Sequence, residues 1–478
     1  MNAQQVKDRV VDLFIKISDI PRPPYHEEKI ADFICDFATK HGCDFYRDEA
    51  NNVLVNVKAT AGCEDRAPIL LQGHTDMVCE KNEGTVHDFL NEGIKITEKD
   101  GWLVADGTTL GADNGVAVAI MLYAIEGGID KHGDIQCLFT SAEEVGLDGV
   151  KKFDFSRIYA KRMINMDGEN ENCVIVGCAG GLRTDIAFDT TYTEISGQIV
   201  EIKITGLRGG HSGENINSGR ANANILMGRI LSEIYHKIGL SLVSIGGGTK
   251  ENAIPREATA CIAVRDADKV KELVLAFGSA VKNEISEDDA NFSISCELVS
   301  GNSSRMMDEK TTRNVITFLT SVKNGIIEMS KKLRGLVEYS RNLGVIKMKD
   351  NKVTFVANSR SVIEAQLDAS ERELSMLGSA CGAVVNHYSR YTGWAYSGES
   401  ALADEYIAVC QKLYGREVEK EMIHAGLECG IIKANVSGLD CISCGPNMKN
   451  LHSPEEALHV ESFGKYAYAI CTLIAEAE

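Results

Sequence analysis

Short apolar runs alternate with longer helical patterns through the first part of the chain. Residues 67–73, 135–140 and 163–166 are short, nearly continuous apolar runs, which is typical of buried strands. Residues 116–126 carry apolar side chains over a helical length and end at Gly127-Gly128, which predicts a helix. A similar pattern returns near the C-terminus, where the apolar run 440–444 precedes a final helix. This alternation predicts an α/β fold, with a mostly parallel sheet covered by helices on both faces.

The middle of the chain has a different pattern of predicted strands and helices. Residues 200–204 alternate like a half-exposed strand, and strand-like and helical patterns then follow each other at 221–235, 258–264, 270–285, 353–357 and 361–380. We therefore expect two small α+β units in tandem, inserted into the α/β domain. The predicted boundaries are 1–183 and 391–478 for the two parts of the α/β domain, and 184–390 for the insertion.

Composition and charge narrow the class of protein. The chain has 478 residues, 44% of them hydrophobic and 25% charged, which is enough for a large core and excludes a disordered chain. No run approaches the ~18 apolar residues of a membrane span, and the first residues lack the apolar region of a secretory signal. We expect a cytoplasmic protein.

The chain is acidic and rich in cysteine. Fifty Lys and Arg against 69 Asp and Glu give a net charge of −19, which argues against nucleic acid or an anionic membrane as a partner. The 15 cysteines show one close pair, Cys441 and Cys444, in an apolar run. We expect reduced thiols, most of them in the core.

Ionisable side chains follow each predicted strand. They are His74 and Asp76 after the first, Asp113 at the entrance of the helix, and then Glu143, Glu144, Asp167 and His452. In open α/β sheets, ligands bind at the carboxyl ends of the strands, so these groups are expected to meet in one crevice. Two histidines with several carboxylates suit Zn, Mn or Co better than Ca or Mg. A dinuclear site fits, because two ions ~3.5–4 Å apart can share a hydroxide and polarise a carbonyl together.

Each residue also has a simpler interpretation. Asp113 could cap the following helix, Glu143 and Glu144 could form a solvated corner, and Asp167-Gly could form a turn. Ser453-Pro-Glu-Glu456 predicts a helix start, with Ser453 as N-cap and Glu456 at the third position. Ligand-type residues at so many strand ends make coincidence the weaker explanation.

Several motifs resemble those of the cocatalytic-zinc peptidases, a family that includes carboxypeptidases, aminoacylases and dipeptidases. They are Gly-His74-Thr-Asp76, Gly-Ala-Asp113-Asn-Gly, Ser-Ala-Glu143-Glu144, Asn-Met-Asp167-Gly, Gly-Gly-His211-Ser-Gly, His-Ala-Gly-Leu-Glu428 and Leu-His452-Ser-Pro-Glu. The resemblance runs over nearly the full chain. Within the family it is sharpest to the bacterial Xaa-His dipeptidases.

The resemblance implies roles for the strand-end residues. Asp113 would bridge two divalent ions, His74 and Asp167 would complete one site, and Glu144 and His452 would complete the other. Asp76 would orient His74. Glu143 would act as general base for the metal-bridging water and then pass its proton to the leaving amine. The catalytic domain would thus hold two metal ions, with zinc expected and manganese or cobalt as alternatives.

The inserted domain would be the family's lid. His211, in a loop between glycines, would stabilise the oxyanion of the tetrahedral intermediate. Asn252 and Arg360 resemble positions that grip the substrate carboxylate, although Arg360 could equally be a surface residue. Glu428 resembles a residue near the free amine of the substrate, with a helix N-terminus lacking any ligand role as the alternative.

We therefore expect a metal-dependent dipeptidase acting on short peptides with a free N-terminus, including Xaa-His dipeptides such as β-alanyl-histidine. An aminoacylase or a dipeptidase of broader specificity would share the same metal chemistry. A binding protein without turnover is disfavoured, because the candidate base Glu143 is present beside all candidate ligands. The tandem units could mimic a dimer within one chain, or one of them could mediate a homodimer.

Overall fold

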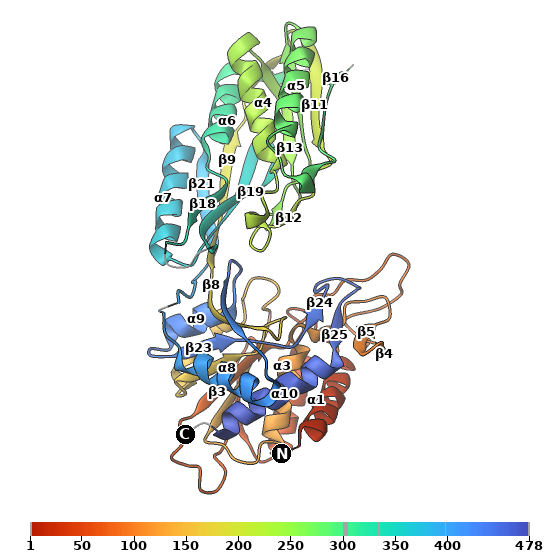
Figure 1. The fold of residues 1–478 in the computed structure, drawn as a ribbon. Helices are drawn as coiled ribbons and strands as arrows, with labels where there is room; N and C mark the ends of the chain where they lie inside the picture. Colours follow the sequence, from red (N-terminus) through yellow and green to blue (C-terminus); the bar gives the residue numbers. More distant parts are fainter. Residues whose placement is uncertain (1, 300–304, 332–334, 397, 477–478) are drawn as a thin grey trace. The chain divides into compact units, whose positions relative to one another are not determined.

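The chain folds into two compact units (Figure 1). The computed structural model describes residues 2–299, 305–331, 335–396 and 398–476. The first unit comprises Met1–Cys178, Trp394–Met422 and Leu427–Glu478, and the second comprises Ala179–Gly393 with Ile423–Gly426. The chain therefore leaves the first unit after Cys178 and re-enters it at Trp394.

The first unit is built on a mixed sheet whose centre is parallel. Four neighbouring strands run parallel, in the order β6 (Ile135–Thr140), β3 (Ile69–His74), β7 (Arg162–Asn165) and β23 (Asp440–Ser443). Antiparallel pairing continues the sheet on both sides: β2 (Val53–Val57) and β1 (Asp44–Arg47) lie beyond β6, and β8 (Cys173–Cys178) lies beyond β23. Strand β22 (Glu419–Ile423) forms the edge next to β8. Every residue of β3 and β6 is buried, which explains their continuous apolar runs. The mostly parallel α/β sheet expected from the sequence is confirmed.

Helices pack on this sheet and on one another. Helix α3 (Ala112–Ile125) lies against β3 and also contacts α1 (Ala3–Ser18), which packs against α10 (Val460–Glu476). Gly73 allows the close approach of β3 and α3, since a Cβ there would lie 2.3 Å from the Ala117 Cβ. The unit also contains the α-helices α2 (Glu28–Lys40), α8 (Ala401–Tyr414) and α9 (Glu428–Asn435). A small sheet joins β4 (Ile96–Lys99), β5 (Trp102–Ala105), β25 (Ala457–His459) and β24 (Met448–Lys449).

The helix predicted to start at Ser453 does not form. Residues 450–456 make a turn, β25 follows it, and α10 begins only at Val460. The Ser453 hydroxyl donates to the Asn450 carbonyl, and the Glu456 carboxylate accepts from the backbone of residues 110–113. The capping prediction was wrong because the Glu456 side chain has a distant partner.

The second unit is an antiparallel sheet with helices. Its strands are ordered β16 (Ser293–Leu298), β11 (Gln198–Thr205), β15 (Ala258–Val264), β13 (Ser241–Gly247), β19 (Val337–Lys349), β20 (Lys352–Ser361), β9 (Gly180–Asp189) and β21 (Val384–Tyr391), with β18 (Gly325–Met329) beside β19. The helices are α4 (Ala223–Ile238), α5 (Ala267–Lys282), α6 (Glu309–Ser321) and α7 (Glu364–Ala380). The two expected α+β units share this sheet, joined where β13 pairs with β19. They also share one hydrophobic core.

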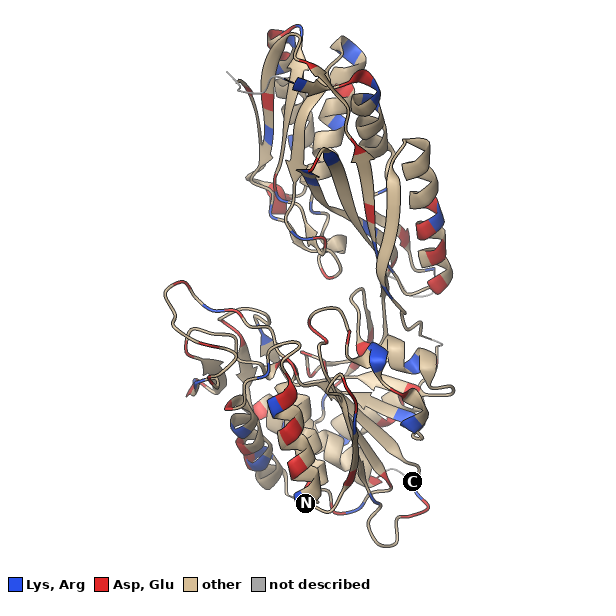
Figure 2. Cartoon of the chain, turned by 180° about the vertical axis from the view of Figure 1, so that it is seen from behind, with Lys and Arg blue, Asp and Glu red and all other residues tan. Residues whose placement is uncertain are grey.

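The cysteines are reduced, and charged residues are spread over both units (Figure 2). All 15 cysteines are free thiols, and most of them are buried. Acidic and basic positions are interspersed along the helices and loops of each unit (Figure 2). Among the residues that the structure describes, no helix has the length and apolar character needed to cross a membrane.

Candidate active site

The ionisable residues at the strand ends of the first unit lie together. Strands β6, β3 and β7 are parallel neighbours, so their carboxyl ends share one edge of the sheet. His74 is the last residue of β3, Glu143 and Glu144 follow β6, and Asp167 follows β7. Asp113 lies in the first turn of α3, and His452 lies in the turn before β25. These side chains therefore cluster at the strand ends, as the sequence predicted.

Asp113 stands at the centre of this cluster, between two imidazoles. Its Oδ1 lies 3.0 Å from the His74 Nε2, and its Oδ2 lies 3.1 Å from the His452 Nε2. The His74 Nε2 is also 3.4 Å from the Asp167 Oδ1, and the His452 Nε2 is 3.2 Å from the Glu144 Oε2. Each oxygen of Asp113 therefore faces a separate set of neighbours.

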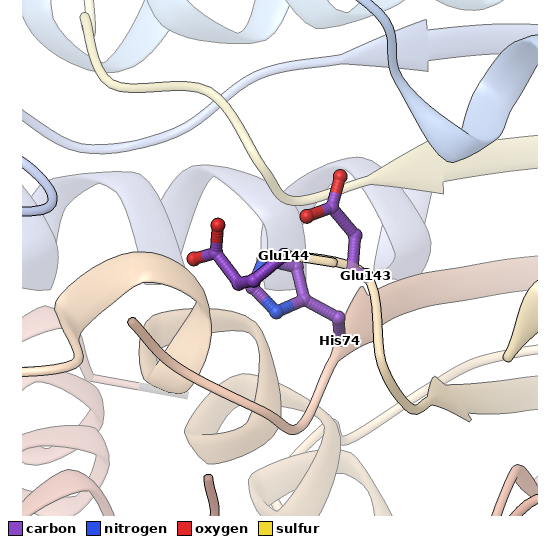
Figure 3. A group of neighbouring side chains, drawn as sticks. All are labelled: His74, Glu143 and Glu144. Carbon is purple, nitrogen blue, oxygen red and sulfur yellow. The ribbon is translucent and has the colours of Figure 1, made fainter. Parts of the chain in front are cut away.

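Three overlapping sets of side chains among the described residues have the spacing of metal ligands. They are His74 with Asp113 and Asp167, Asp113 with Glu144 and His452, and His74 with Glu143 and Glu144. Within each set the ligand atoms lie within 4.8 Å of one another. Figure 3 shows the third set, with the carboxylates of Glu143 and Glu144 diverging from one turn beside the His74 ring.

Asp76 holds the parts of this cluster together. Its side chain is fully buried, and its Oδ1 lies 3.5 Å from the His74 Nδ1. The same carboxylate accepts hydrogen bonds from the backbone N–H groups of Glu143 and Glu144, at 3.0 and 3.1 Å. Asp76 thus fixes the turn that carries both glutamates as well as lying beside the imidazole.

Burial and crowding shift the titration of these groups. Burial, followed by repulsion from Asp113, raises the pKa of Glu144 to about 7. Burial also raises the pKa of Glu143 well above its ordinary value, against the attraction of His74. The hydrogen bonds with Asp113 and Glu144 raise the pKa of His452 to about 11. Burial would raise the pKa of Asp113, but its hydrogen bonds with His452 and His74 hold it below the ordinary value.

The donor set fits divalent cations. Carboxylates and imidazole nitrogens are ligands of zinc, manganese and cobalt, and a cation among them would offset the repulsion between buried carboxylates. The Glu144 Oε1 is buried without a hydrogen-bond partner in the structure, so this carboxylate has a free lone pair. The Asn114 amide donates to the Asp167 Oδ1 at 2.5 Å, which fixes the orientation of that carboxylate.

Glu428 lies near the same cluster, in the first unit. It is the first residue of α9 and is 1% exposed. Its Oε2 accepts from the Gln72 amide and the Thr140 hydroxyl, at 2.5 and 2.6 Å, whereas its Oε1 is buried without a partner. Burial raises the pKa of Glu428 to about 7.

The three candidates of the second unit also lie together. His211 is in the short strand β12 (Gly210–His211), which pairs with β14 (Ala253–Ile254) directly after Asn252. Arg360, in β20, is 6% exposed; its Nη1 donates to the Tyr391 hydroxyl at 2.9 Å, and its Nη2 lies 3.5 Å from the His211 Nε2. Arg360 is therefore not a surface residue.

Sequence reasoning missed several residues that hold the cluster. Arg22 donates to backbone carbonyls of the segments that carry His74 and Asp113, and Glu27 accepts from the Ala142 N–H just before Glu143. Glu456, considered only as a helix cap, accepts from the backbone that leads to Asp113. A buried charge far along the sequence from its partners gives no local pattern. The one available signal was the ionisable residues within Pro21-Arg22-Pro-Pro-Tyr-His-Glu27.

Comparison with known proteins shows which family the chain resembles in sequence and in fold. Residues 70–476 match the model of peptidase family M20/M25/M40. The chain is 37% identical over 470 residues to the cytosol non-specific dipeptidase of Escherichia coli, covering 97% of this chain and 96% of that protein. It superposes on the aminoacylhistidine dipeptidase of Vibrio alginolyticus with a TM-score of 0.88 and 34% identity, over 98% and 96% of the two chains. The aminopeptidase PepT of Bacillus cereus shares the fold at 17% identity, with a TM-score of 0.57 and 98% of each chain covered.

Proposed function

Because the chain belongs to peptidase family M20/M25/M40, we propose that it is a metal-dependent dipeptidase with a two-metal centre, in which Asp113 would belong to both ligand sets. The observation that carries the proposal is the position of Asp113, whose two oxygens face His74 with Asp167 on one side and His452 with Glu144 on the other. A carboxylate shared by two ligand sets is the arrangement that a dinuclear centre needs.

In the proposed centre, His74, Asp113 and Asp167 would hold one ion, and Asp113, Glu144 and His452 would hold the other. Zinc fits this mixture of imidazole and carboxylate ligands, and manganese and cobalt are the alternatives. When bound, the ions supply Lewis acidity toward the peptide carbonyl and make water a better nucleophile at neutral pH. Asp76 orients the His74 ring and the turn of Glu143 and Glu144.

Glu143 is the proposed proton carrier. Its carboxylate lies beside those of the ligand sets, where a carboxylate can take and release a proton, and burial raises its pKa above the ordinary value of a glutamate. It takes a proton from the attacking water and then gives a proton to the nitrogen of the leaving amine. Because Glu143 gains one proton and then loses one, its carboxylate is ionised again at the end of the cycle.

The remaining candidates are assigned to the substrate. In the second unit, Arg360 and Asn252 grip the substrate carboxylate, and His211 stabilises the oxyanion of the tetrahedral intermediate. In the first unit, the unpartnered Oε1 of Glu428 pairs with the free amine of the substrate. The second unit acts as the lid of the catalytic unit in this proposal.

Dipeptides with a free amine are the proposed substrates, Xaa-His dipeptides among them. The support comes from two similar proteins, one named a cytosol non-specific dipeptidase and the other an aminoacylhistidine dipeptidase. We also propose a cytoplasmic location, on the strength of the cytosolic relative.

A substrate panel tests this function. The metal-loaded enzyme is assayed on β-alanyl-histidine, glycyl-leucine and the N-acetylated form of each. We expect hydrolysis of both free dipeptides and a large loss of activity on the acetylated ones, because acetylation removes the positive charge of the amine with which Glu428 pairs. Comparable turnover of acetylated and free substrates would favour an aminoacylase. If the metal-loaded protein hydrolysed none of these substrates, the proposal that it is a dipeptidase would be wrong.

A further inference from the structure

Two buried charged residues outside the ligand sets grip the backbone just before Asp113. Arg22 and Glu456 are each 2% exposed, and they lie 434 positions apart in the sequence, from 22 to 456. Both belong to the first unit. Charged side chains are rarely buried unless they have specific partners, and here the partners are main-chain groups of the segments that carry the candidate ligands.

Glu456 receives the N–H groups at the start of α3. Its Oε2 accepts from Leu110 and Gly111 at 2.8 and 3.0 Å, and its Oε1 accepts from Ala112 and Asp113 at 2.8 and 3.3 Å. The first N–H groups of a helix have no partner within the helix, and a carboxylate there is also favoured by the helix dipole. Glu456 is four positions after His452, so this contact ties the turn of one imidazole to the segment of Asp113.

Arg22 donates hydrogen bonds to a carbonyl group of the same segment and to two carbonyl groups of the segment after His74. Its Nη2 donates to the Gly111 carbonyl at 2.6 Å, and its Nη1 donates to the carbonyls of Thr75 and Asp76 at 3.0 and 3.3 Å. Those two residues directly follow His74. The planar fork of the guanidinium therefore sets the distance between the His74 and Asp113 segments, which a single ammonium could not do.

Gly111 is hydrogen-bonded to both Glu456 and Arg22. Its N–H binds Glu456 and its carbonyl binds Arg22. Its φ of 72° is left-handed, and a Cβ at this position would lie 2.5 Å from the Arg22 Nη2. A glycine is thus required both for the turn and for the approach of the guanidinium.

We infer that Arg22 and Glu456 are positioning residues of the metal centre, which set the spacing of His74, Asp113 and His452 through the backbone of residues 110–113. The inference rests on the proposed function, since those three residues are the proposed ligands. Neither side chain is a proposed ligand of the metal ions or of the substrate. Their effect is on how well the ligand sets are formed before metal arrives.

Binding of Co²⁺ to metal-free protein tests the inference, because the visible spectrum of Co²⁺ reports its ligand geometry. Two variants are compared with wild type. Arg22→Lys keeps the positive charge but loses the planar guanidinium with its two donor nitrogens. Glu456→Gln leaves a single oxygen to accept from four N–H groups. Arg341→Lys is the matched control: Arg341 is fully buried in the second unit and donates to Tyr339, Ser359 and Ser370.

We expect Arg22→Lys and Glu456→Gln to weaken Co²⁺ binding by about 10–100-fold and to alter its visible spectrum. The kcat for a dipeptide should fall with KM little changed, because the substrate contacts are intact. Arg341→Lys should lower the melting temperature without changing Co²⁺ affinity.

Wild-type Co²⁺ affinity and spectrum in the folded variants would overturn the inference. Loss of the folded state in both variants would overturn it as well, since the pair would then serve the fold rather than the centre. If wild-type protein itself bound no Co²⁺, the proposed function would fail instead.

Discussion

Glu143 and Glu144 are neighbours in sequence with the same charge, and their side chains have different surroundings. The Glu144 Oε2 lies 3.2 Å from the His452 Nε2, within the set that includes Asp113. The Glu143 carboxylate diverges from it on the other side of the turn (Figure 3). Both backbone N–H groups are held by Asp76, so replacing either side chain leaves the turn in place. The pair therefore allows a clean separation of metal binding from proton transfer.

We expect Glu143→Gln to retain two metals per chain and to bind substrate, yet to turn it over hardly at all, because no group takes the proton from water. Glu144→Gln should lose one metal on mild chelation, since a neutral oxygen is a poorer ligand for a dication, with activity partly rescued by excess metal. Metal analysis after dialysis and a dipeptide assay measure both outcomes. Swapped phenotypes would reverse the assignment, and full metal with full activity in both would remove these glutamates from the centre.

At the scale of strands and helices, the sequence predicted the parts of the fold that local patterns encode. The buried runs that became β3, β6, β7 and β23 were visible because parallel strands are apolar on both faces. The residues following them could be placed at one edge, because parallel strands end on the same side. Fold class and the candidate cluster followed from these two regularities, with the motif resemblance adding the roles.

Contacts between distant segments were beyond local patterns. Ser453 and Glu456 have the spacing of a capping box, but the Glu456 carboxylate binds the start of α3 instead of its own turn. Likewise, nothing around Arg22 indicates that its partners are the carbonyls of Thr75, Asp76 and Gly111. Such partners are fixed by the tertiary fold, so a single sequence carries no periodic signal for them.

The packing of α3 on β3 gives a prediction at this scale. In Gly73→Ala, the new Cβ would meet the Ala117 Cβ at 2.3 Å and the Asn114 Oδ1 at 2.4 Å. We expect the free energy of unfolding to fall by about 1–3 kcal/mol, because the strand and the helix must move apart. Metal affinity should also fall, since His74 ends the strand and Asn114 orients Asp167.

Denaturant unfolding and metal titration measure these two effects. Gly246→Ala, in β13, is the control, because the nearest atom to its new Cβ is the Ile346 carbonyl oxygen at 3.6 Å. An unchanged stability in Gly73→Ala would contradict the close packing of β3 and α3.

For the whole molecule, the second unit is proposed to deliver His211 to the substrate. His211→Ala should lower kcat by about 10²–10³-fold while both metals stay bound, as expected for loss of an oxyanion donor. An unchanged kcat would remove His211 from the mechanism. Mixing Glu143→Gln with His211→Ala protein then identifies the source of the imidazole. Recovered activity would show that His211 acts across two copies of the chain, and its absence would place His211 in the same chain.

In the proposed function, the cluster around Asp113 holds two metal ions that the dipeptidase activity requires. The most direct measurement is a titration of metal-free protein with Zn²⁺, following bound metal and hydrolysis of glycyl-leucine together. We expect activity to be absent without metal and to reach its maximum at two equivalents per chain, with Asp113→Asn failing to reach it because both ligand sets lose their shared carboxylate. Full activity after complete removal of metal, or two bound zinc ions without hydrolysis of any free dipeptide, would contradict the claim.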